Sequence, residues 1–294
     1  MEKAEIENLK KAGEISKQVK IFARSIIKKG DLLVEIAEKI EKKIVELGGK
    51  PAFPVNLSIN EIAAHATPSL NEETKAHGLL KVDIGVHIEG YSADTAFSLD
   101  LENSSENKKL IDAAELALQK AVEIFSFGVK FREVGAIIEK TIKSHGAEPI
   151  RNLSGHSIGH YDLHSGMNVP NHDNFSEQTI ENDVYAIEPF ATTGHGQVID
   201  GKKSGIYHLE KAGTVRDPFA REILNYIKEE YKTLPFCVRW LEKKFSSRAL
   251  IAMKRIEEAG LVHHYNQLIE KDRKPVAQAE HTIIIEGNKK IITT

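Results

Sequence analysis

The feature that most constrains the fold of this 294-residue chain is an internal repeat. Residues 28–51, KKGDLLVEIAEKIEKKIVELGGKP, match residues 126–149, SFGVKFREVGAIIEKTIKSHGAEP, at a constant offset of 98 positions. The identical pairs are Gly30/Gly128, Glu35/Glu133, Ile40/Ile138, Glu41/Glu139, Lys42/Lys140, Ile44/Ile142, Gly48/Gly146 and Pro51/Pro149. Each copy reads as a helix that ends at glycine, followed by an extended segment that begins at proline, and a further helix precedes each copy. The pattern predicts two related α/β halves that contribute equivalent strands to a shared site.

Two aspartates stand in a predicted β-hairpin of the first half, LLKVDIGVHIEGYSADTAFSL, residues 79–99, although aspartate is depleted in strands. A turn centred on Ile88 and Glu89, followed by Gly90, predicts that Asp83 and Asp94 lie directly opposite each other on one face. Like charges at that separation are destabilising unless a cation lies between them. The hairpin alone leaves two interpretations open, a pair of satisfied surface carboxylates and a cation site.

Further acidic residues and histidines follow in strand-like stretches of both halves. The first half offers His65, Asp83 and Asp94, and the second offers His156 and His164 in NLSGHSIGHYDLHSG, Glu188 in DVYAIEPF and Glu280 in VAQAEHTIIIEG. Apolar neighbours indicate that the strands are buried, where an unpaired carboxylate is costly. Two aspartates, two glutamates and one histidine are a suitable ligand set for a pair of divalent ions, since oxygen ligands suit manganese, iron(II) or cobalt and an imidazole also allows zinc.

Composition excludes several classes of protein. The chain is 28% charged and 41% hydrophobic, as in globular proteins, and its formal net charge of -3 favours neither a nucleic-acid binder nor a membrane-surface protein. The first twenty residues read as a charged amphipathic helix and not as a signal peptide, and no run approaches the roughly 20 apolar residues that cross a bilayer. The single cysteine, Cys237, is expected to be a buried apolar residue, and a reducing, cytoplasmic location is expected.

The segments VDIGVHIEGYSADTAF, LSGHSIGHYDLHSG, AIEPF and AEHTI, in this order, resemble the methionine aminopeptidases over nearly the whole chain. The resemblance implies an α/β (α+β) pita-bread fold, in which two pseudo-symmetric α/β halves surround a central curved antiparallel sheet. It also implies a hydrolase with two divalent metal ions, whose identity (Co, Mn, Fe(II) or Zn) stays open. The implied metal ligands are Asp83, Asp94, His156, Glu188 and Glu280.

The resemblance also assigns roles to residues around the metals. Glu188 would transfer a proton from the attacking water to the leaving amide nitrogen, and His65 and His164 would donate to the substrate carbonyl oxygen. The methionine side chain would contact Phe53, Leu163 and His208, beside the same two histidines. The implied substrates are the N-termini of nascent polypeptides and peptides that carry methionine before a small second residue. A monomer is expected, with no membrane partner and no specific nucleic acid, and contact with the ribosome stays open.

The spacing of the last two acidic residues predicts an insert. Glu188 and Glu280 are 92 residues apart, and residues 214–275 have a helical pattern. This block resembles the helical, winged-helix-like insert of type II methionine aminopeptidases, so residues 1–213 and 276–294 are expected to form the catalytic domain. The block carries thirteen basic and nine acidic residues, and we expect it to form a wall of the active-site cleft rather than to bind DNA.

Two rival functions use the same fold. Proline-directed peptidases such as prolidase and aminopeptidase P usually carry an additional N-terminal domain, whereas the first repeat begins here near residue 9. Non-catalytic relatives that bind RNA or protein should have lost metal ligands, and all five are present. The remaining histidines, His160, His172, His195, His263 and His264, are expected to be incidental, and His281 is expected to point away from the metals, because neighbours along a strand face opposite sides.

Overall fold

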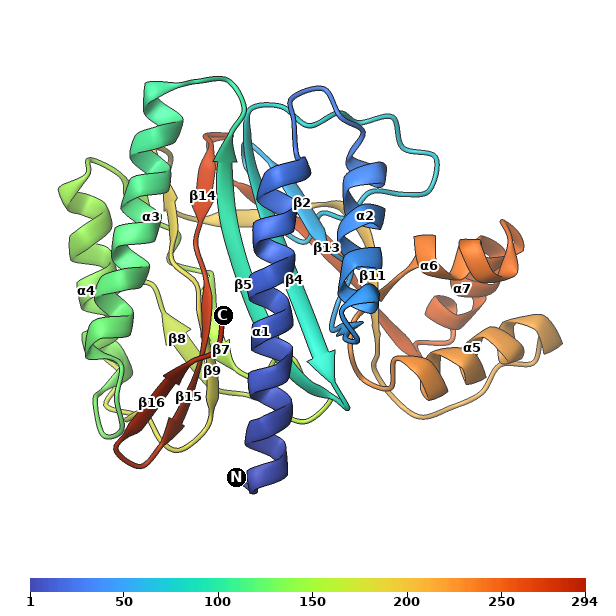
Figure 1. Cartoon of the computed structure of the whole chain (residues 1–294). Helices are drawn as coiled ribbons and strands as arrows, with labels where there is room; N and C mark the ends of the chain where they lie inside the picture. Colours follow the sequence, from blue (N-terminus) through green and yellow to red (C-terminus); the bar gives the residue numbers. More distant parts are fainter.

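Two pairs of long helices cover the outer face of the strands, one pair from each half, in the computed structural model of residues 1–294 (Figure 1). The helices of the first pair are α1 (Lys3–Ile26) and α2 (Leu33–Glu46), and those of the second are α3 (Ser105–Ile124) and α4 (Phe131–Ser144). α2 and α4 have the same length of 14 residues and start 98 positions apart. The predicted repeat is therefore a structural repeat.

Each repeated helix buries one apolar stripe at helical spacing. In α2 the stripe includes Leu33, Ile36, Ile40 and Ile44, and in α4 it includes Phe131, Val134, Ile138 and Ile142. The glycines that follow α2 and α4, Gly48 and Gly146, have φ values of 87° and 73°. A residue in this conformation ends a helix, and only glycine adopts it without steric cost. The glycines of the repeat therefore determine where these two helices end.

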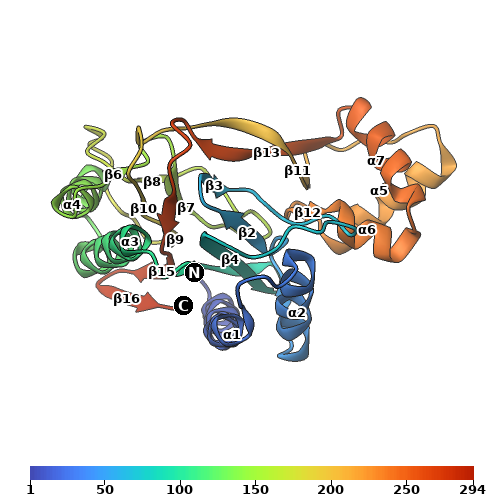
Figure 2. The same cartoon turned by 90° about the horizontal axis from the view of Figure 1, so that it is seen from above.

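All strand pairings are antiparallel, and the two halves meet along β5 and the β14–β15 segment (Figure 1), while Figure 2 shows the same strands from above. The first-half strands are β1 (Lys50–Pro51), β2 (Asn56–Ile59), β3 (Ile62–Ala64), β4 (Leu79–Ile88) and β5 (Tyr91–Asp100). The others are β6 (Glu148–Pro149), β7 (Ser154–Ser157), β8 (Asn168–Pro170), β9 (Val184–Ile187), β10 (Phe190–Thr192), β11 (Val198–Leu209), β12 (Phe236–Cys237), β13 (Val262–Glu270), β14 (Val276–Gln278), β15 (His281–Glu286) and β16 (Lys289–Ile292). The Thr282 hydroxyl accepts from the Asp94 N–H at 2.7 Å and donates to its carbonyl at 2.8 Å, so one side chain joins the halves.

The hairpin register differs from the predicted one by two residues. The turn lies at Glu89 and Gly90, with φ values of 50° and 84°, and it pairs Asp94 with Gly85 and Asp83 with Ala96. Direct opposition of the two aspartates was therefore a wrong prediction. A two-residue turn with positive φ at both centres disfavours the β-branched Ile88 and favours glycine. Because the shift is an even number of residues, Asp83 and Asp94 stay on the same face.

Residues 214–275 contain three helices and two strands. The helices α5 (Pro218–Glu230), α6 (Val238–Phe245) and α7 (Arg248–Glu258) pack around their own apolar core, which includes Ile223, Leu241 and Met253. The strand β13 leaves this block and pairs with β11 and β3 (Figures 1 and 2). Cys237, in β12, is buried as expected.

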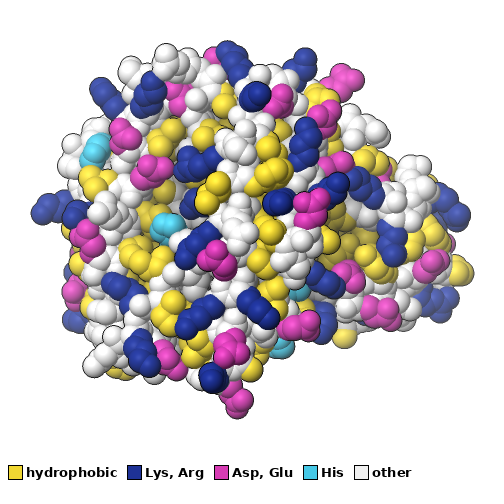
Figure 3. Space-filling view, in the orientation of Figure 1, with side chains coloured by type: hydrophobic (Ala, Val, Ile, Leu, Met, Phe, Trp, Pro, Cys, Tyr) yellow, Lys and Arg dark blue, Asp and Glu magenta, His cyan; other side chains and the backbone are white.

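The surface that carries α1 and α3 has basic and acidic side chains interspersed, with apolar side chains between them (Figure 3). Such a mixture creates no extended field of one sign on this face. None of the helices combines the length and the apolar character that a membrane span requires.

Candidate metal centre and active site

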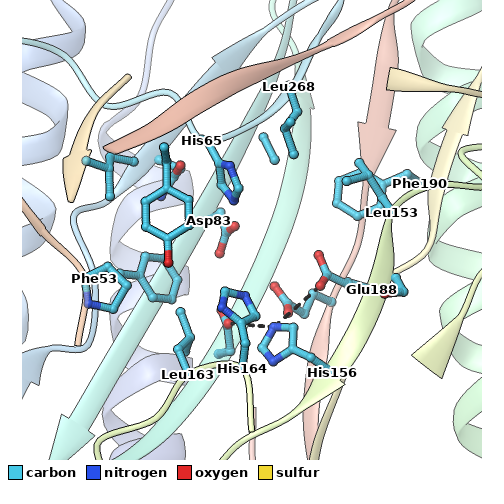
Figure 4. Close-up of a pocket in the computed structure, with 18 of the residues that line it drawn as sticks. Phe53, His65, Asp83, Leu153, His156, Leu163, His164, Glu188, Phe190 and Leu268 are labelled. Carbon is cyan, nitrogen blue, oxygen red and sulfur yellow. Dashed lines mark ion pairs between the residues drawn. The ribbon is translucent and has the colours of Figure 1, made fainter. Parts of the chain in front are cut away.

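Four carboxylates and one imidazole from both halves converge in one cavity of about 220 Å³ (Figure 4). Asp83 comes from β4, Asp94 from β5 and His156 from β7, while Glu188 follows β9 and Glu280 precedes β15. His156 Nε2 lies 3.8 Å from Asp94 Oδ2 and 3.6 Å from Glu188 Oε1. Asp94, His156 and Glu280 each offer one potential ligand atom, and these three atoms lie within 4.8 Å of one another. The structure therefore brings all five predicted ligands together.

Burial shifts the pKa values of these groups strongly. It raises the pKa of Asp83 to about 7, and burial together with neighbouring carboxylates raises the pKa values of Asp94, Glu188 and Glu280 well above their ordinary range. Burial, with a smaller effect of His164, lowers the pKa of His156 to about 3, so this imidazole is neutral. One oxygen each of Asp83, Asp94 and Glu280 is buried without a hydrogen-bond donor.

This arrangement fits a pair of divalent cations. Unpaired carboxylates in a buried cavity are costly, and a neutral imidazole cannot compensate their charge. Cations of hard or borderline character would satisfy the free oxygens and use the imidazole nitrogen as a further ligand. The donor set is therefore that of a dinuclear site.

Sequence reasoning missed the side chains that hold the ligands. Gln278 is buried and donates from Nε2 to Glu188 Oε2 at 3.2 Å, and Asn171 Nδ2 donates to the Glu188 carbonyl at the same distance. Gln278 stands two residues before Glu280, so the period of two along an extended segment could have placed it on the ligand face. No comparable local pattern in the sequence indicates that Asn171 contacts Glu188 or that Thr282 contacts Asp94.

His65 and His164 lie on two sides of the cavity, outside the five-ligand set (Figure 4). The His65 ring packs against Tyr265 with 5.0 Å between ring centroids, and the His164 ring lies 4.4 Å from that of His156. Burial lowers the pKa of His65 to about 4 and also lowers the pKa of His164. Both rings are thus neutral at pH 7, and each has one N–H to donate.

Phe53 and Leu163 form a small apolar cluster with Ala52 at one end of the cavity. A Cβ atom at Gly85 would lie 2.3 Å from the Phe53 ring, so the residue opposite Asp94 must be glycine for this ring to occupy its place. His208 is not among the residues that line the cavity; its ring lies 5.2 Å from Tyr265, and its Nε2 lies 3.4 Å from Glu210 Oε2. Tyr265, which sequence reasoning missed, lines the cavity in this region.

The other histidines lie outside the cavity lining. His160 stacks on Tyr91, and His264 stacks on Tyr207. His281 lines a separate surface groove between α1 and α3 and contacts Thr294, so it faces away from the ligands as predicted. His172, His195 and His263 are also absent from the cavity lining.

Comparison with known proteins identifies the family. Residues 7–240 match metallopeptidase family M24. The chain is 47% identical over 297 aligned positions to a methionine aminopeptidase of Pyrococcus abyssi and 46% identical to one of Pyrococcus horikoshii, and in both cases 99% of each chain is covered. The chain belongs to the M24 metallopeptidases.

Solved structures with the same fold include methionine aminopeptidases, prolidases and an Arx1. A thermophilic Arx1 superposes with a TM-score of 0.86 at 17% identity, covering 100% of this chain and 91% of that one. A methionine aminopeptidase of Thermotoga maritima gives a TM-score of 0.72 at 21% identity, with coverage of 100% and 98%. These likenesses confirm the predicted pita-bread fold.

Metal binding to this M24 site should release protons near neutral pH. The raised pKa values of the four carboxyl groups mean that the metal-free site holds protons that cations must displace. We expect the apparent affinity for divalent metal to increase as the pH rises through about 7. Calorimetric titrations in two buffers of different ionisation enthalpy would measure the released protons, and an affinity independent of pH would contradict the assignment.

The same pKa shifts predict how the stability of the metal-free protein depends on pH. The pKa of Asp83 is raised from 3.8 to about 7, so its stabilising contribution is fully present below 3.8 and is lost as the pH rises through 7. Burial lowers the pKa values of His65 and His156 from 6.5 to about 4 and about 3, so these groups reduce stability only below pH 6.5. Above pH 6.5 the thermal midpoint of the metal-free protein should therefore fall, and added metal should abolish this fall.

Proposed function

We propose that this protein is a metallo-aminopeptidase that removes the N-terminal methionine from nascent proteins and peptides when the second residue is small. The observation that carries the proposal is the convergence of four carboxylates, two buried and two half-buried, and a neutral imidazole beside an apolar pocket, in a chain 47% identical to a methionine aminopeptidase over 99% of its length. Asp83, Asp94, His156, Glu188 and Glu280 would hold two divalent ions, from among Co, Mn, Fe(II) and Zn.

The bound ions would supply hydroxide at neutral pH and polarise the scissile carbonyl. Glu188 would accept the proton of the attacking water and transfer it to the leaving amide nitrogen, and Gln278 would hold its carboxylate in place. His65 and His164 would donate their N–H groups to the carbonyl oxygen, where negative charge develops, and would orient the peptide. Both imidazoles are neutral, His65 half-buried and His164 at the exposed side of the cavity, so each can donate without carrying a charge into the site.

The pocket around Phe53 and Leu163 would receive the methionine side chain. Both residues are apolar and buried, and the ring of Phe53 packs directly against Gly85. An unbranched thioether fits such a pocket, since it adapts to irregular apolar surfaces and contacts aromatic rings favourably. We propose Tyr265 as a further side chain at this end of the cavity, and His208 as a neighbour that supports Tyr265.

The proposal extends to the domain organisation, the partners and the location. Residues 1–213 and 276–294 would form the catalytic domain, and residues 214–275 would form the insert, which contributes Pro235 and Tyr265 to the cavity wall. The substrates would be the N-termini of nascent polypeptides in the cytoplasm, and the enzyme would act as a monomer. The ribosome is an additional candidate partner, and co-sedimentation of the protein with ribosomes would test this contact.

Metal analysis of the purified protein combined with a peptide assay tests this function. We expect about two divalent ions per chain and release of methionine from a Met-Ala-Ser peptide, with loss of activity after chelation and recovery on adding metal. A matched Met-Leu-Ser peptide should react more slowly if the second residue must be small. Cleavage of a Xaa-Pro peptide instead would indicate a proline-directed peptidase, and metal-free protein without activity would indicate a binding protein.

A further inference from the structure

A buried ion pair joins the insert to the helix layer of the first half. Arg239, in α6, donates from Nη1 to Glu41 Oε2 and from Nη2 to Glu41 Oε1, both at 2.7 Å. Arg239 is 2% exposed and Glu41, in α2, is 8% exposed. Trp240 Nε1 also donates to Glu41 Oε2 at 2.9 Å. Two residues 198 positions apart thus form a bidentate pair with little access to water.

The remaining hydrogen bonds of this pair reach the segment of residues 53–68, which carries Phe53 and His65. Arg239 Nε donates to the Pro68 carbonyl at 3.0 Å, and Glu41 Oε1 accepts from the Val55 N–H at 3.3 Å. The Thr67 hydroxyl donates to the Val55 carbonyl at 2.9 Å. The ion pair therefore contacts this segment just beyond Phe53 and again just beyond His65.

The backbone of His65 needs such support. Its φ value is 58°, in the left-handed region that a non-glycine residue adopts at a cost. A conformation of this kind persists only where surrounding contacts hold it. The hydrogen bonds at Thr67 and Pro68 lie two and three residues after it.

The internal repeat explains why the cation comes from the insert. Glu139 is the equivalent of Glu41, and its carboxylate accepts from Arg151 of its own half at 2.6 Å. At the repeat offset of 98, the position of Arg151 corresponds to Phe53, which lines the active-site cavity. Lys143 also lies 2.9 Å from Glu139, and at the same offset it corresponds to Val45, so the first half has apolar residues at both positions where the second half has cations. Arg239 supplies the positive charge that Glu41 would otherwise lack.

We propose that Arg239 and Glu41 are positioning residues for His65 and Phe53, so that the insert holds the substrate-binding segment in its active conformation in addition to walling the cleft. The inference rests on the proposed aminopeptidase function. It also means that deletion of residues 214–275 would remove the partners of Glu41 together with the cleft wall. Point substitutions therefore give a sharper test than removal of the block.

The experiment compares Arg239→Met with Lys243→Met, both in α6. Lys243 forms an exposed ion pair with Glu38 and so joins the same two helices without touching residues 53–68. We expect Arg239→Met to retain its bound metal, because all five ligands lie on other elements, and to lose about 100-fold in kcat/KM for Met-Ala-Ser through misplacement of His65. Lys243→Met should keep the parent kcat/KM within about twofold, as exposed ion pairs contribute little.

A double variant separates positioning from stability. Glu41→Met combined with Arg239→Met replaces the buried pair with apolar side chains, which often preserves stability. It nevertheless lacks the hydrogen bonds to Val55 and Pro68, so its kcat/KM should stay low while its thermal midpoint recovers. Parent kinetics in a folded double variant would overturn the proposal, and so would loss of metal from Arg239→Met, which would indicate an effect on the ligands instead.

Amide hydrogen exchange provides a readout that does not depend on activity. Residues 53–68 should lose protection in Arg239→Met and in the double variant, but not in Lys243→Met. If the parent protein fails to cleave Met-Ala-Ser, the proposed function fails, and unchanged exchange in residues 53–68 would separately refute the positioning role.

Discussion

Asp94→Asn should abolish peptidase activity and reduce bound metal while the fold survives. Asp94 is 4% exposed and contributes to the cluster with His156 and Glu280, and an amide is a much weaker ligand than a carboxylate. Loss of metal-derived transition-state stabilisation of several kcal/mol predicts a decrease in kcat/KM on the order of 1,000-fold or more. Metal content by atomic emission and peptide kinetics on the same sample would measure both effects.

The fold should survive because the hydrogen bonds of Thr282 go to the backbone of Asp94 and not to its side chain. The metal-free variant should be at least as stable as the metal-free parent, since a neutral amide replaces a carboxyl group whose ionisation is disfavoured by burial and by Glu280. A variant that is fully active and contains the normal amount of metal would refute the role of Asp94. An unfolded variant would show that the carboxyl group is structural.

His65→Ala and His164→Ala should each retain metal and lose about 100-fold or more in kcat, because each removes one hydrogen-bond donor to the developing oxyanion. The five ligands remain in place in both variants, so metal content should match that of the parent. Steady-state kinetics with Met-Ala-Ser and metal analysis would check these two expectations together.

His160→Ala is the matched control for these variants. His160 is a histidine of the same NLSGHSIGHYDLHSG segment as His164, but it stacks on Tyr91 outside the cavity, so its removal should leave kcat near the parent value. Loss of metal from His65→Ala or His164→Ala would mean that the residue is a ligand and not a hydrogen-bond donor to substrate.

The period of two in strands placed the two candidate aspartate ligands on one face, while the choice of His156 among the histidines came from the resemblance to the methionine aminopeptidases. A shift of two residues in the hairpin register left Asp83 and Asp94 on one face, so the wrong turn position did not alter the predicted site. The same period of two places Gln278 beside Glu280, although sequence analysis did not use it. The position of His208 was less predictable, because β11 contains bulges between Asp200 and Tyr207 that interrupt regular alternation.

Contacts between distant segments had no signal in the sequence. Arg239 and Glu41 are separated by 198 positions, and Asp94 and Thr282 by 188. Each of these residues in isolation is compatible with an ordinary surface position. Their burial and their partners depend on how α6 packs against α2 and on how β5 meets β15, and local periodicity contains no information about either contact.

The amino-acid sequence by itself determined the two-half architecture and the ends of the repeated helices, because glycine conformation and helical spacing are local physical constraints, and strand alternation placed the two hairpin aspartates on one face. The set of five candidate ligands also needed the resemblance of the sequence to the methionine aminopeptidases. Only the tertiary structure decided which side chains orient those ligands, that Tyr265 and not His208 lines the cavity, and that the insert contacts the segment carrying His65. These features arise from the packing of elements far apart in the chain, where the cost of burying an unpaired charge selects the partner.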